Sequence, residues 1–312
     1  MLYFLPYLVI LISSIGIWSG TAPWAGFIIL FVLFPIIEWL FKNAKLSQKT
    51  TSSDFAVLSM PFALSIFLGL SLWTAKFTGD SLQIAGIIFS SGAIIGGFGI
   101  TSAHELIHRR KKWQRAFGVY NLTLVNFAYW GVEHVFGHHK LVSTPSDTAT
   151  ARVNESLYHF FVRNYLGLNR GCFKLEPKKY FTYWSLSLIN SLLVFHFLGL
   201  KVLLIWGGIS AVAILLLLSV DYIEHYGLLR SQDQAGNYLG FKPEHSWDTE
   251  SPLTNYILFN LGRHSAHHQK ASLAFSSLDS NSDAKQLPYG YSVMILISLL
   301  PPIYFRIMKK LV

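Results

Sequence analysis

Apolar residues occur in long runs along this chain, and these runs predict its main elements. A bilayer core of about 30 Å is crossed by about 20 helical residues, and six runs come close to that length. They occupy residues 2–17, 24–41, 55–74, 82–99, 180–200 and 202–220. Short turns join them in pairs. We therefore expect an all-α integral membrane protein with six transmembrane helices in three hairpins.

A seventh apolar run, residues 291–308, has a different character. Pro301 and Pro302 interrupt it, and Lys309 and Lys310 follow it directly. Because proline inside a helix removes a hydrogen bond and kinks the backbone, this run predicts an interfacial or buried helix rather than another span.

The composition agrees with a membrane protein. Hydrophobic residues make up 52% of the chain and charged residues 13%, with a mean hydropathy of +0.41. In soluble domains about a quarter of the residues are charged. The single cysteine, Cys172, excludes an internal disulfide and a thiolate-bound iron–sulfur cluster, and it is expected to be a small core residue. Electrons for any redox reaction would have to come from another protein.

The positive charges predict an orientation. With the N-terminus inside, the outer turns hold only Lys76 and Lys201, and the other 23 of the 25 Lys and Arg lie inside. No basic residue precedes Lys42, so the first run is expected to remain as an anchor rather than act as a secretory signal. We expect one domain, residues 1–312, in a bacterial inner membrane. Its N-terminus and its polar regions, residues 101–179 and 221–312, would be cytoplasmic.

The net charge of +9 bears on the partners of the protein. Basic residues at membrane ends are attracted to anionic lipid headgroups, which is the simplest explanation of this charge; the alternative is that part of this surface binds an acidic partner protein. No basic–aromatic module is present, so nucleic-acid binding is not expected.

Histidine is the residue type that points to chemistry. Nine of the 12 histidines lie in four blocks near the predicted cytoplasmic ends of helices. They are His104 and His108; His134, His138 and His139; His225; and His264, His267 and His268. Imidazole binds iron, copper, nickel and zinc, and nine imidazoles exceed the needs of one tetrahedral zinc ion. Two metal ions that share the set are the simplest interpretation.

The spacing within the blocks predicts which rings share a helix face. His104 and His108 are four residues apart, as are His134 and His138, so each pair is expected on one face, with His139 one position around. The last trio is expected on one side of its helix.

Two other classes of protein fit part of this pattern. The segment from His104 to His108 reads His-Glu-x-x-His, the zinc-protease signature in which Glu105 would be the general base. That interpretation leaves seven clustered histidines without a role. A membrane protein that stores or transports metal ions would instead spread its histidines through the spans.

Carboxylates near the histidines are candidates to support them. A metal-bound histidine usually donates its second ring N–H to a carboxylate or a carbonyl oxygen. The candidates are Glu105, Glu133, Asp221 and Glu224. The spacing leaves open whether one of them binds or bridges a metal.

Several polar residues have simpler explanations. His159 and His196 lack partners at metal-binding spacing and are expected to be interfacial polar groups. His245 is expected either to support a neighbouring metal ligand or to stabilise the fold, rather than to bind a metal. Glu38 precedes Lys42 by four residues, which predicts a helix-end ion pair.

The apolar runs at residues 24–41, 55–74 and 82–99 are candidates to line a channel for an apolar molecule from the bilayer. Trp39 or a bulky neighbour would set its depth. Small residues on the fourth run permit either close helix packing or an open groove. They are Ser90, Ser91, Gly92, Gly96, Gly97 and Gly99.

The four histidine blocks also carry a resemblance to a known family. In order they read His-Glu-Leu-Ile-His, Glu-His-x-x-Gly-His-His, Tyr-Ile-Glu-His-Tyr-Gly-Leu and Arg-His-Ser-x-His-His. This order resembles the membrane-bound alkane 1-monooxygenase (alkane hydroxylase) family, within the histidine-rich di-iron hydroxylases and desaturases, from about Thr101 to the C-terminus. The resemblance implies that the nine histidines hold two non-haem irons. It also implies terminal hydroxylation of an alkane with O2, and electrons from rubredoxin or ferredoxin through an NAD(P)H-dependent reductase.

The chain departs from the family pattern at three positions. Asp221 stands where the family usually has Asn, Gly262 where it has Gln, and Glu244 where it commonly has His. None of these removes a ligand histidine. They leave the substrate open between an alkane, the methyl group of an aromatic such as xylene, and a fatty acyl chain that would be desaturated.

Overall fold

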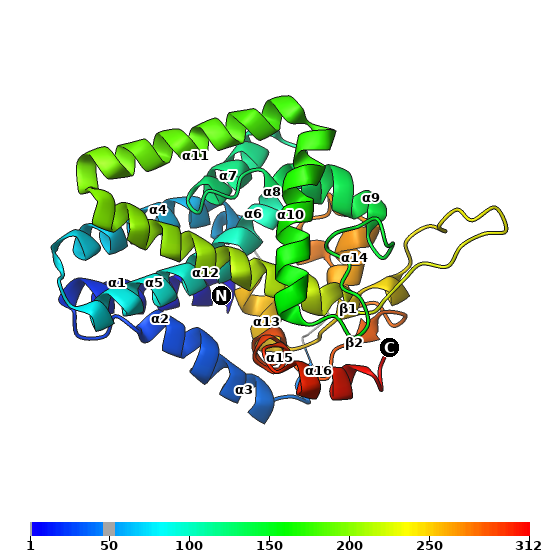
Figure 1. Cartoon of the computed structure of the whole chain (residues 1–312). Helices are drawn as coiled ribbons and strands as arrows, with labels where there is room; N and C mark the ends of the chain where they lie inside the picture. The colour runs from blue at the N-terminus through cyan, green and yellow to red at the C-terminus, as the bar shows by residue number, and fades with distance from the viewer. Residues whose placement is uncertain (1, 46–53) are drawn as a thin grey trace.

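A computed structural model describes residues 2–45 and 54–312 of the chain, and helices dominate it (Figure 1). The α-helices are α1 (Leu5–Ser19), α2 (Ala25–Ile28), α3 (Phe34–Leu40), α4 (Phe55–Phe77), α5 (Ser81–Ile94), α6 (Ile100–Ile107), α7 (Lys112–Thr123), α8 (Trp130–Glu133), α9 (His139–Leu141), α10 (Leu157–Leu175), α11 (Pro177–Leu198), α12 (Leu200–His225), α13 (Pro252–Ile257), α14 (His264–Gln269), α15 (Tyr291–Ser298) and α16 (Pro301–Met308).

Shorter elements connect these helices. Three are π-helices: η2 (Ile29–Leu33), η3 (Ile95–Gly99) and η4 (His134–His138). Three are 3-10 turns: η1 (Leu2–Phe4), η5 (Pro243–His245) and η6 (Phe275–Ser277). Two short strands, β1 (Trp247–Asp248) and β2 (Lys285–Gln286), pair in parallel.

Within residues 2–45 and 54–312, five helical stretches are long and apolar enough to cross a bilayer: Leu2–Ser19, Phe55–Phe77, Ser81–Ile107, Pro177–Leu198 and Leu200–His225. A sixth, Ala25–Leu40, is apolar but shorter. The predicted all-α membrane protein is therefore confirmed, and each predicted run coincides with a helix. The arrangement of six spans in three hairpins stays a prediction.

Two of these stretches run further than predicted. The run expected at residues 82–99 continues as one helical rod through η3 and α6 to Ile107, and the run expected at 202–220 continues to His225. His104 therefore lies on the same continuous helical rod as the apolar residues 82–99, and His225 lies on the same helix as the apolar residues 202–220.

Small residues allow these two rods to pack closely. A Cβ atom added at Gly96 would lie 2.9 Å from the Ala213 Cα atom of α12, and one added at Gly92 would lie 2.5 Å from Val212 Cβ. Both distances are shorter than van der Waals contact. Gly92 and Gly96 therefore have the packing role that the sequence left open, and Gly96 and Gly97 both border an apolar pocket.

Helix α11 is bordered by other helices on little of its surface. Ser187 is its one buried residue, and Figure 1 shows α11 along the edge of the bundle next to α12. Apolar side chains on such a helix suit contact with lipid tails.

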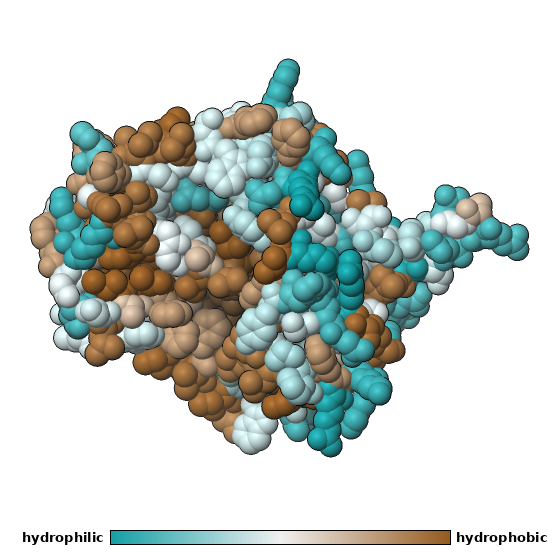
Figure 2. Space-filling view, viewed as in Figure 1, coloured by the Kyte–Doolittle hydropathy of each residue, from teal (hydrophilic) through white to brown (hydrophobic). Residues whose placement is uncertain are grey.

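The surface divides into an apolar part and a polar part. Figure 2 shows hydrophobic side chains over the region of α2, α5, α11 and α12, and hydrophilic side chains around α9, α10 and α16. A polar hairpin protrudes from the hydrophilic side, closed by a backbone bond from Leu239 N–H to Ser231 O. The histidine blocks lie on the polar side of the fold.

The C-terminal apolar run forms two short helices, as its prolines indicated. Helix α15 ends at Ser298 and α16 begins at Pro301. Tyr291 and Met294 of α15 are buried, as are Tyr304 and Met308 of α16. The expectation of a partly buried element broken at its prolines is confirmed, whereas its position at a membrane interface stays a prediction, and Cys172 is buried as expected.

The predicted ion pair of Glu38 is wrong. Its side chain is 3% exposed, and its carboxylate accepts hydrogen bonds from Ser251, Thr254 and Ser292. The helix points Glu38 inward against α13 and α15, so hydroxyl and backbone donors take the place that spacing assigned to Lys42.

The close packing of η3 against α12 gives a test of the fold. We expect Gly96→Leu to destabilise the protein by about 1–3 kcal/mol, because the added side chain meets the α12 backbone. Gly69→Leu on α4 is the matched control, since a Cβ there meets nothing within 4 Å. Thermal unfolding of both variants in detergent measures the difference. Equal melting temperatures would contradict the packing role of Gly96.

Candidate metal centre

Four elements carry the nine clustered histidines. The α5–α6 rod supplies His104 and, at its C-terminal end, His108. Segment η4 with α9 supplies the second block, α12 ends with His225, and α14 holds the last trio. The rods from the membrane and the polar segments therefore meet at the histidines.

The structure divides the nine histidines into two groups. The first contains His104, His108, His134, His139 and His267. The second contains His138, His225, His264 and His268. In each group one nitrogen per ring lies within 4.8 Å of all the others. The sequence predicted the set of residues, and the structure shows which of them face one another.

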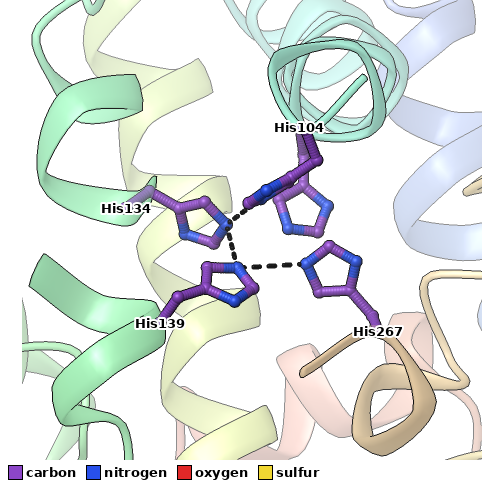
Figure 3. Close-up of side chains that lie close together, drawn as sticks. His104, His134, His139 and His267 are labelled. Atoms are coloured by element: carbon purple, nitrogen blue, oxygen red, sulfur yellow. Dashed lines mark hydrogen bonds between the residues drawn. The ribbon is translucent and has the colours of Figure 1, made fainter. Parts of the chain in front are cut away.

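The second histidine block corrects a prediction. His134 and His138 were expected to share a face, but they belong to different groups, and His134 pairs with His139 instead. Segment η4 is a π-helix, in which hydrogen bonds join residues five apart, so His134 and His139 come into register. Their Nε2 atoms lie 3.1 Å apart (Figure 3).

Helix α14 also presents its trio to both groups rather than to one side. His264 and His268, four residues apart, have Nε2 atoms 3.0 Å from each other. His267 turns to the other group, with its Nε2 atom 3.2 Å from that of His139. One short helix thus contributes to both groups.

The nitrogen separations fit metal ions. Facing Nε2 atoms lie 3.1 Å apart in the pair His108–His134 and 3.2 Å apart in the pair His138–His268. On an ion with bonds of about 2.1 Å, ligands at right angles are about 3.0 Å apart and tetrahedral ligands about 3.4 Å apart. The five nitrogens of the first group exceed a tetrahedral set, whereas the second group offers four.

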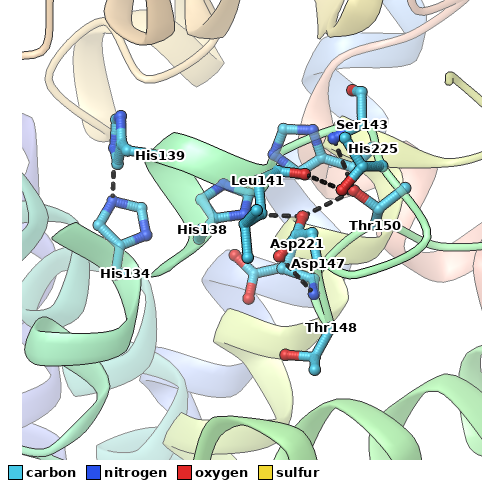
Figure 4. A network of polar contacts seen from close by, with 12 residues as sticks. His134, His138, His139, Leu141, Ser143, Asp147, Thr148, Thr150, Asp221 and His225 are labelled. Carbon is cyan, nitrogen blue, oxygen red and sulfur yellow. Dashed lines mark hydrogen bonds and ion pairs between the residues drawn. The ribbon is translucent and has the colours of Figure 1, made fainter. Parts of the chain in front are cut away.

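Carboxylates lie behind some of the rings. His138 Nδ1 is 3.0 Å from Asp147 Oδ2, which also accepts a bond of 2.6 Å from the Thr150 hydroxyl (Figure 4). Because the carboxylate only accepts, the His138 Nδ1 atom carries a proton, and Nε2 is the ring atom that faces the other histidines of its group. The second contact joins His264 Nδ1 to Glu224 Oε1 at 3.4 Å. The contact of His138 with Asp147 fits the support that metal-bound histidines commonly receive, whereas His264 Nδ1 forms no hydrogen bond with Glu224 in the described residues.

The four predicted carboxylates have different surroundings. Glu224 lies beside His264 as expected and also accepts a 2.7 Å bond from the Tyr291 hydroxyl. Asp221 accepts a 3.5 Å bond from Asn164. Glu133 is buried, and its Oε2 atom has no hydrogen-bond partner among the described residues.

Glu105 is engaged elsewhere. It forms a 2.8 Å ion pair with Arg109 and accepts a 3.1 Å bond from the Phe275 N–H. A zinc-protease base needs a carboxylate free to face a metal-bound water, so this arrangement argues against that role for Glu105.

Two supporting residues were not predicted from the sequence. Asp147 follows His139 by eight residues, and an acidic residue so close to a histidine block was a usable signal. Asp248 binds the start of α14 by accepting 2.7 and 2.6 Å bonds from the Ser265 N–H and hydroxyl. It comes directly after Trp247 and lies far in sequence from the residue it binds, so spacing could not identify it.

Burial keeps most of these rings neutral. It lowers the pKa of His108 to about 3, with a further contribution from His138. Burial first, and neighbouring imidazoles next, hold the pKa values of His134, His139 and His267 well below the usual range. Neutral imidazole is the form that binds metal ions.

His138 is the exception. Burial lowers its pKa, but the charge and hydrogen bond of Asp147 outweigh this and leave the pKa above its ordinary value. The same pairing lowers the pKa of Asp147 although burial alone would raise it. Burial, followed by the charge of Asp147, raises the pKa of Glu133 to about 8, so that carboxyl is mostly protonated at pH 7.

The other three histidines stay outside both groups, as predicted. The His159 ring is mostly exposed and pairs with Glu155 at 2.9 Å. His196 lies beside Phe197 on α11. His245 is buried, and its Nδ1 atom accepts a 2.9 Å bond from the Lys242 N–H, so it stabilises the local turn.

An apolar pocket reaches the histidines from the membrane helices, and Figure 2 shows the apolar surface hollowed between α12 and α3. Three parts of the chain supply its membrane-side lining. They are Leu30, Phe31 and Phe34 of η2–α3; Gly96, Gly97 and Phe98 of η3; and Leu216, Leu217 and Val220 of α12. His104, His134 and His264 line its inner end.

The pocket lining corrects two predictions. No residue of α4 lines it, although residues 55–74 were expected to, because α12 takes that place. Trp39 is 58% exposed and does not line the pocket, whereas Phe31 and Phe34, earlier on the same helical stretch, do. The helix turns Trp39 outward because Glu38, one position before it, points inward.

Comparisons with known proteins agree with this geometry. Residues 81–297 match the family model described as fatty acid desaturase. The chain is 33% identical to "Alkane 1-monooxygenase 2" of Pseudomonas aeruginosa, over 92% of the chain and 83% of that protein. It is 32% identical to "Alkane 1-monooxygenase 2" of Alcanivorax borkumensis, over 95% and 85%. It is 24% identical to the xylene/toluene monooxygenase hydroxylase component of Pseudomonas putida, over 94% and 82%.

The contact between His138 and Asp147 yields a test. We expect Asp147→Asn to weaken metal retention by about tenfold to a hundredfold, because His138 loses the charge that fixes its ring. The exposed hairpin residue Asp233 accepts a similar bond from the N–H two residues on, so Asp233→Asn is the matched control. Chelator competition followed by metal analysis measures retention. Equal retention in both variants would exclude a supporting role for Asp147.

Proposed function

The chain belongs to the fatty acid desaturase family and, within it, to the alkane 1-monooxygenases, and from this membership we propose that it hydroxylates the terminal methyl group of an alkane. The observation that carries the proposal is the convergence of nine histidines, in two groups, at the inner end of an apolar pocket. A metal-storage protein would not need such a pocket, and a zinc protease would not need nine imidazoles.

The proposed cofactor is a pair of non-haem irons. The first group, with His104 and His134, would hold one ion, and the second group, with His138 and His225, would hold the other. Imidazole-rich, thiolate-free sites suit iron, and the bound pair would supply the chemistry that activates O2. The balanced reaction is R–CH3 + O2 + 2 e− + 2 H+ → R–CH2OH + H2O.

The protein's own residues would bind and orient the substrate. An alkane that partitions into the bilayer would enter the pocket and place its end near His104, His134 and His264. The aromatic side chains Phe31 and Phe34 and the aliphatic residues of α12 exclude water from the reacting carbon.

The electrons are proposed to come from rubredoxin or ferredoxin with an NAD(P)H-dependent reductase. The chain has a single buried cysteine and so cannot hold a thiolate-bound cluster of its own. The charge pattern supports a cytoplasmic N-terminus and active site in a bacterial inner membrane, with basic residues available to an acidic carrier.

Product analysis tests this proposal. The purified chain in lipid bilayers, given rubredoxin, reductase and NAD(P)H, is expected to convert an alkane to the 1-alcohol with one oxygen atom from isotope-labelled O2. About two irons per chain are expected to accompany activity. The control omits rubredoxin. A single zinc ion with no iron would overturn the proposal.

The same assay separates the second candidates. The similarity to the xylene/toluene monooxygenase component favours testing xylene, and the desaturase family match favours testing a fatty acyl thioester. Hydroxylation of xylene alone, or formation of an alkene, would replace the alkane assignment.

Gly97 offers a test of where the substrate lies. It lines the pocket, and a Cβ there would be 3.4 Å from Leu30 Cδ2. We expect Gly97→Phe to shift the preferred alkanes to shorter chains, because the ring occupies the pocket. Gly207→Phe is the matched membrane-helix control, since Gly207 is exposed and a Cβ there meets nothing within 4 Å. An unchanged chain-length profile in Gly97→Phe would place the substrate elsewhere.

A further inference from the structure

We propose that Glu38 determines substrate specificity from behind the wall of the apolar pocket. Its carboxylate ties α3 to α13 and α15, and the position of these helices sets the shape of the pocket. The proposal rests on the proposed function for the identity of the substrate. Glu38 itself does not line the pocket, so its role is one of positioning.

Both carboxylate oxygens of Glu38 are fully engaged. The Ser251 hydroxyl donates to Oε1 at 2.7 Å, and the Thr254 hydroxyl donates to the same oxygen. The Ser292 N–H donates to Oε2 at 3.0 Å, and the Ser292 hydroxyl also donates there. Four donors from two other parts of the chain thus converge on one buried carboxylate of α3.

The tied elements are those that form the pocket. Phe34 lies one turn before Glu38 on α3 and faces the pocket. Thr254 of α13 and Ser292 of α15 bind Glu38 and also line the pocket themselves. Figure 1 shows α3 and α15 next to each other, in line with their contacts. A displacement of Glu38 would therefore shift α3 relative to α13 and α15, and all three helices contribute to the pocket lining.

Gly290 makes room for this arrangement. A Cβ atom added at Gly290 would overlap the Glu38 carboxylate at both oxygens. Any larger residue must push the carboxylate away from its donors. The contacts of Glu38 can therefore be disturbed from the α15 side without a change to Glu38.

The directions of the hydrogen bonds favour a role of Glu38 in holding helices together over a role in delivering protons to the pocket. Glu38 borders a polar cleft, where Lys42, Lys45 and Glu250 are the charged residues nearby. The hydroxyl proton of Thr254 points to Glu38, and its oxygen accepts a 2.9 Å bond from the Tyr291 N–H. Because the hydroxyl protons are directed to the carboxylate and away from the pocket, proton delivery through Glu38 is not favoured.

The test compares two variants that disturb these contacts from opposite sides. Glu38→Gln replaces one acceptor oxygen with an NH2 group that faces donors, and Gly290→Ala displaces the carboxylate. Trp39→Phe is the control beside Glu38, since Trp39 is mostly exposed and off the pocket. Gly69→Ala is the control for the glycine change. If Glu38→Gln fails to fold, Glu38→Asp takes its place.

Two readouts are needed. One is the relative kcat/KM for n-alkanes from hexane to hexadecane. The other is the quenching of Trp130 fluorescence by brominated alkanes of the same lengths, which needs no turnover, because Trp130 lines the pocket. Because the chain has nine tryptophans, the contribution of Trp130 is obtained as the part of the quenching that is lost in the Trp130→Phe variant.

We expect Glu38→Gln and Gly290→Ala to retain metal and to lose discrimination between chain lengths by on the order of tenfold to a hundredfold, in both readouts. The double variant should be no worse than either single one, because both act on the same contact. The two controls should keep the wild-type profile.

Other outcomes would overturn the proposal. Wild-type chain-length profiles in both variants would show that Glu38 does not determine the shape of the pocket. An unchanged profile with a larger solvent isotope effect on kcat would assign Glu38 to proton transfer instead. If the wild-type chain forms no alcohol from any alkane, the proposed function fails, and the quenching profile still decides the role of Glu38.

Discussion

The crowding of nine imidazoles in one buried region is the constraint on which the rest of the structure depends. Burial removes the water that would solvate these rings, and neutral rings offer converging lone pairs that repel unless cations or shared protons lie between them. The rest of the fold must therefore offset the free-energy cost of burying these rings and of bringing their lone pairs together. Asp147 fixes His138, Glu224 lies against His264, and Asp248 holds the start of α14. These acidic residues therefore help to hold in place histidines that come from four separate parts of the chain.

The π-helical segments show how the chain aims side chains within continuous helices. Segments η2, η3 and η4 are the three π-helices in residues 2–45 and 54–312. The first two supply pocket residues, among them Phe31 and Gly97, and the third supplies His134 and His138. A π-turn inserts one residue into the α-helical repeat and so rotates the next part of the helix around its axis. All three rotations occur where the pocket or the histidines need them, consistent with the general concentration of π-turns at functional sites.

Composition and spacing predicted much of this protein because the dominant forces are simple. Long apolar runs must be helical in lipid, and histidine blocks at helix ends indicate metal binding, so the helices and all nine histidines followed from the sequence. The grouping did not follow, because α-helical spacing pairs His134 with His138 while the π-turn pairs it with His139. Glu38 was misassigned for a similar reason. Its partners Ser251 and Ser292 are more than 200 residues away, and local spacing offered Lys42 instead.

The clustered histidines and one wall of the apolar pocket come from different parts of the chain. The α5–α6 rod and α12 run without a break from the pocket to the histidines, so they fix the distance between the pocket and the two histidine groups. The wall formed by η2 and α3 carries no histidine of either group, and in the part of the chain that the structure describes Glu38 provides its side-chain hydrogen bonds to α13 and α15. The family match begins at residue 81, after this wall, and includes every clustered histidine. Changes in the N-terminal wall can therefore alter the pocket while the residues that would hold the metals remain in place.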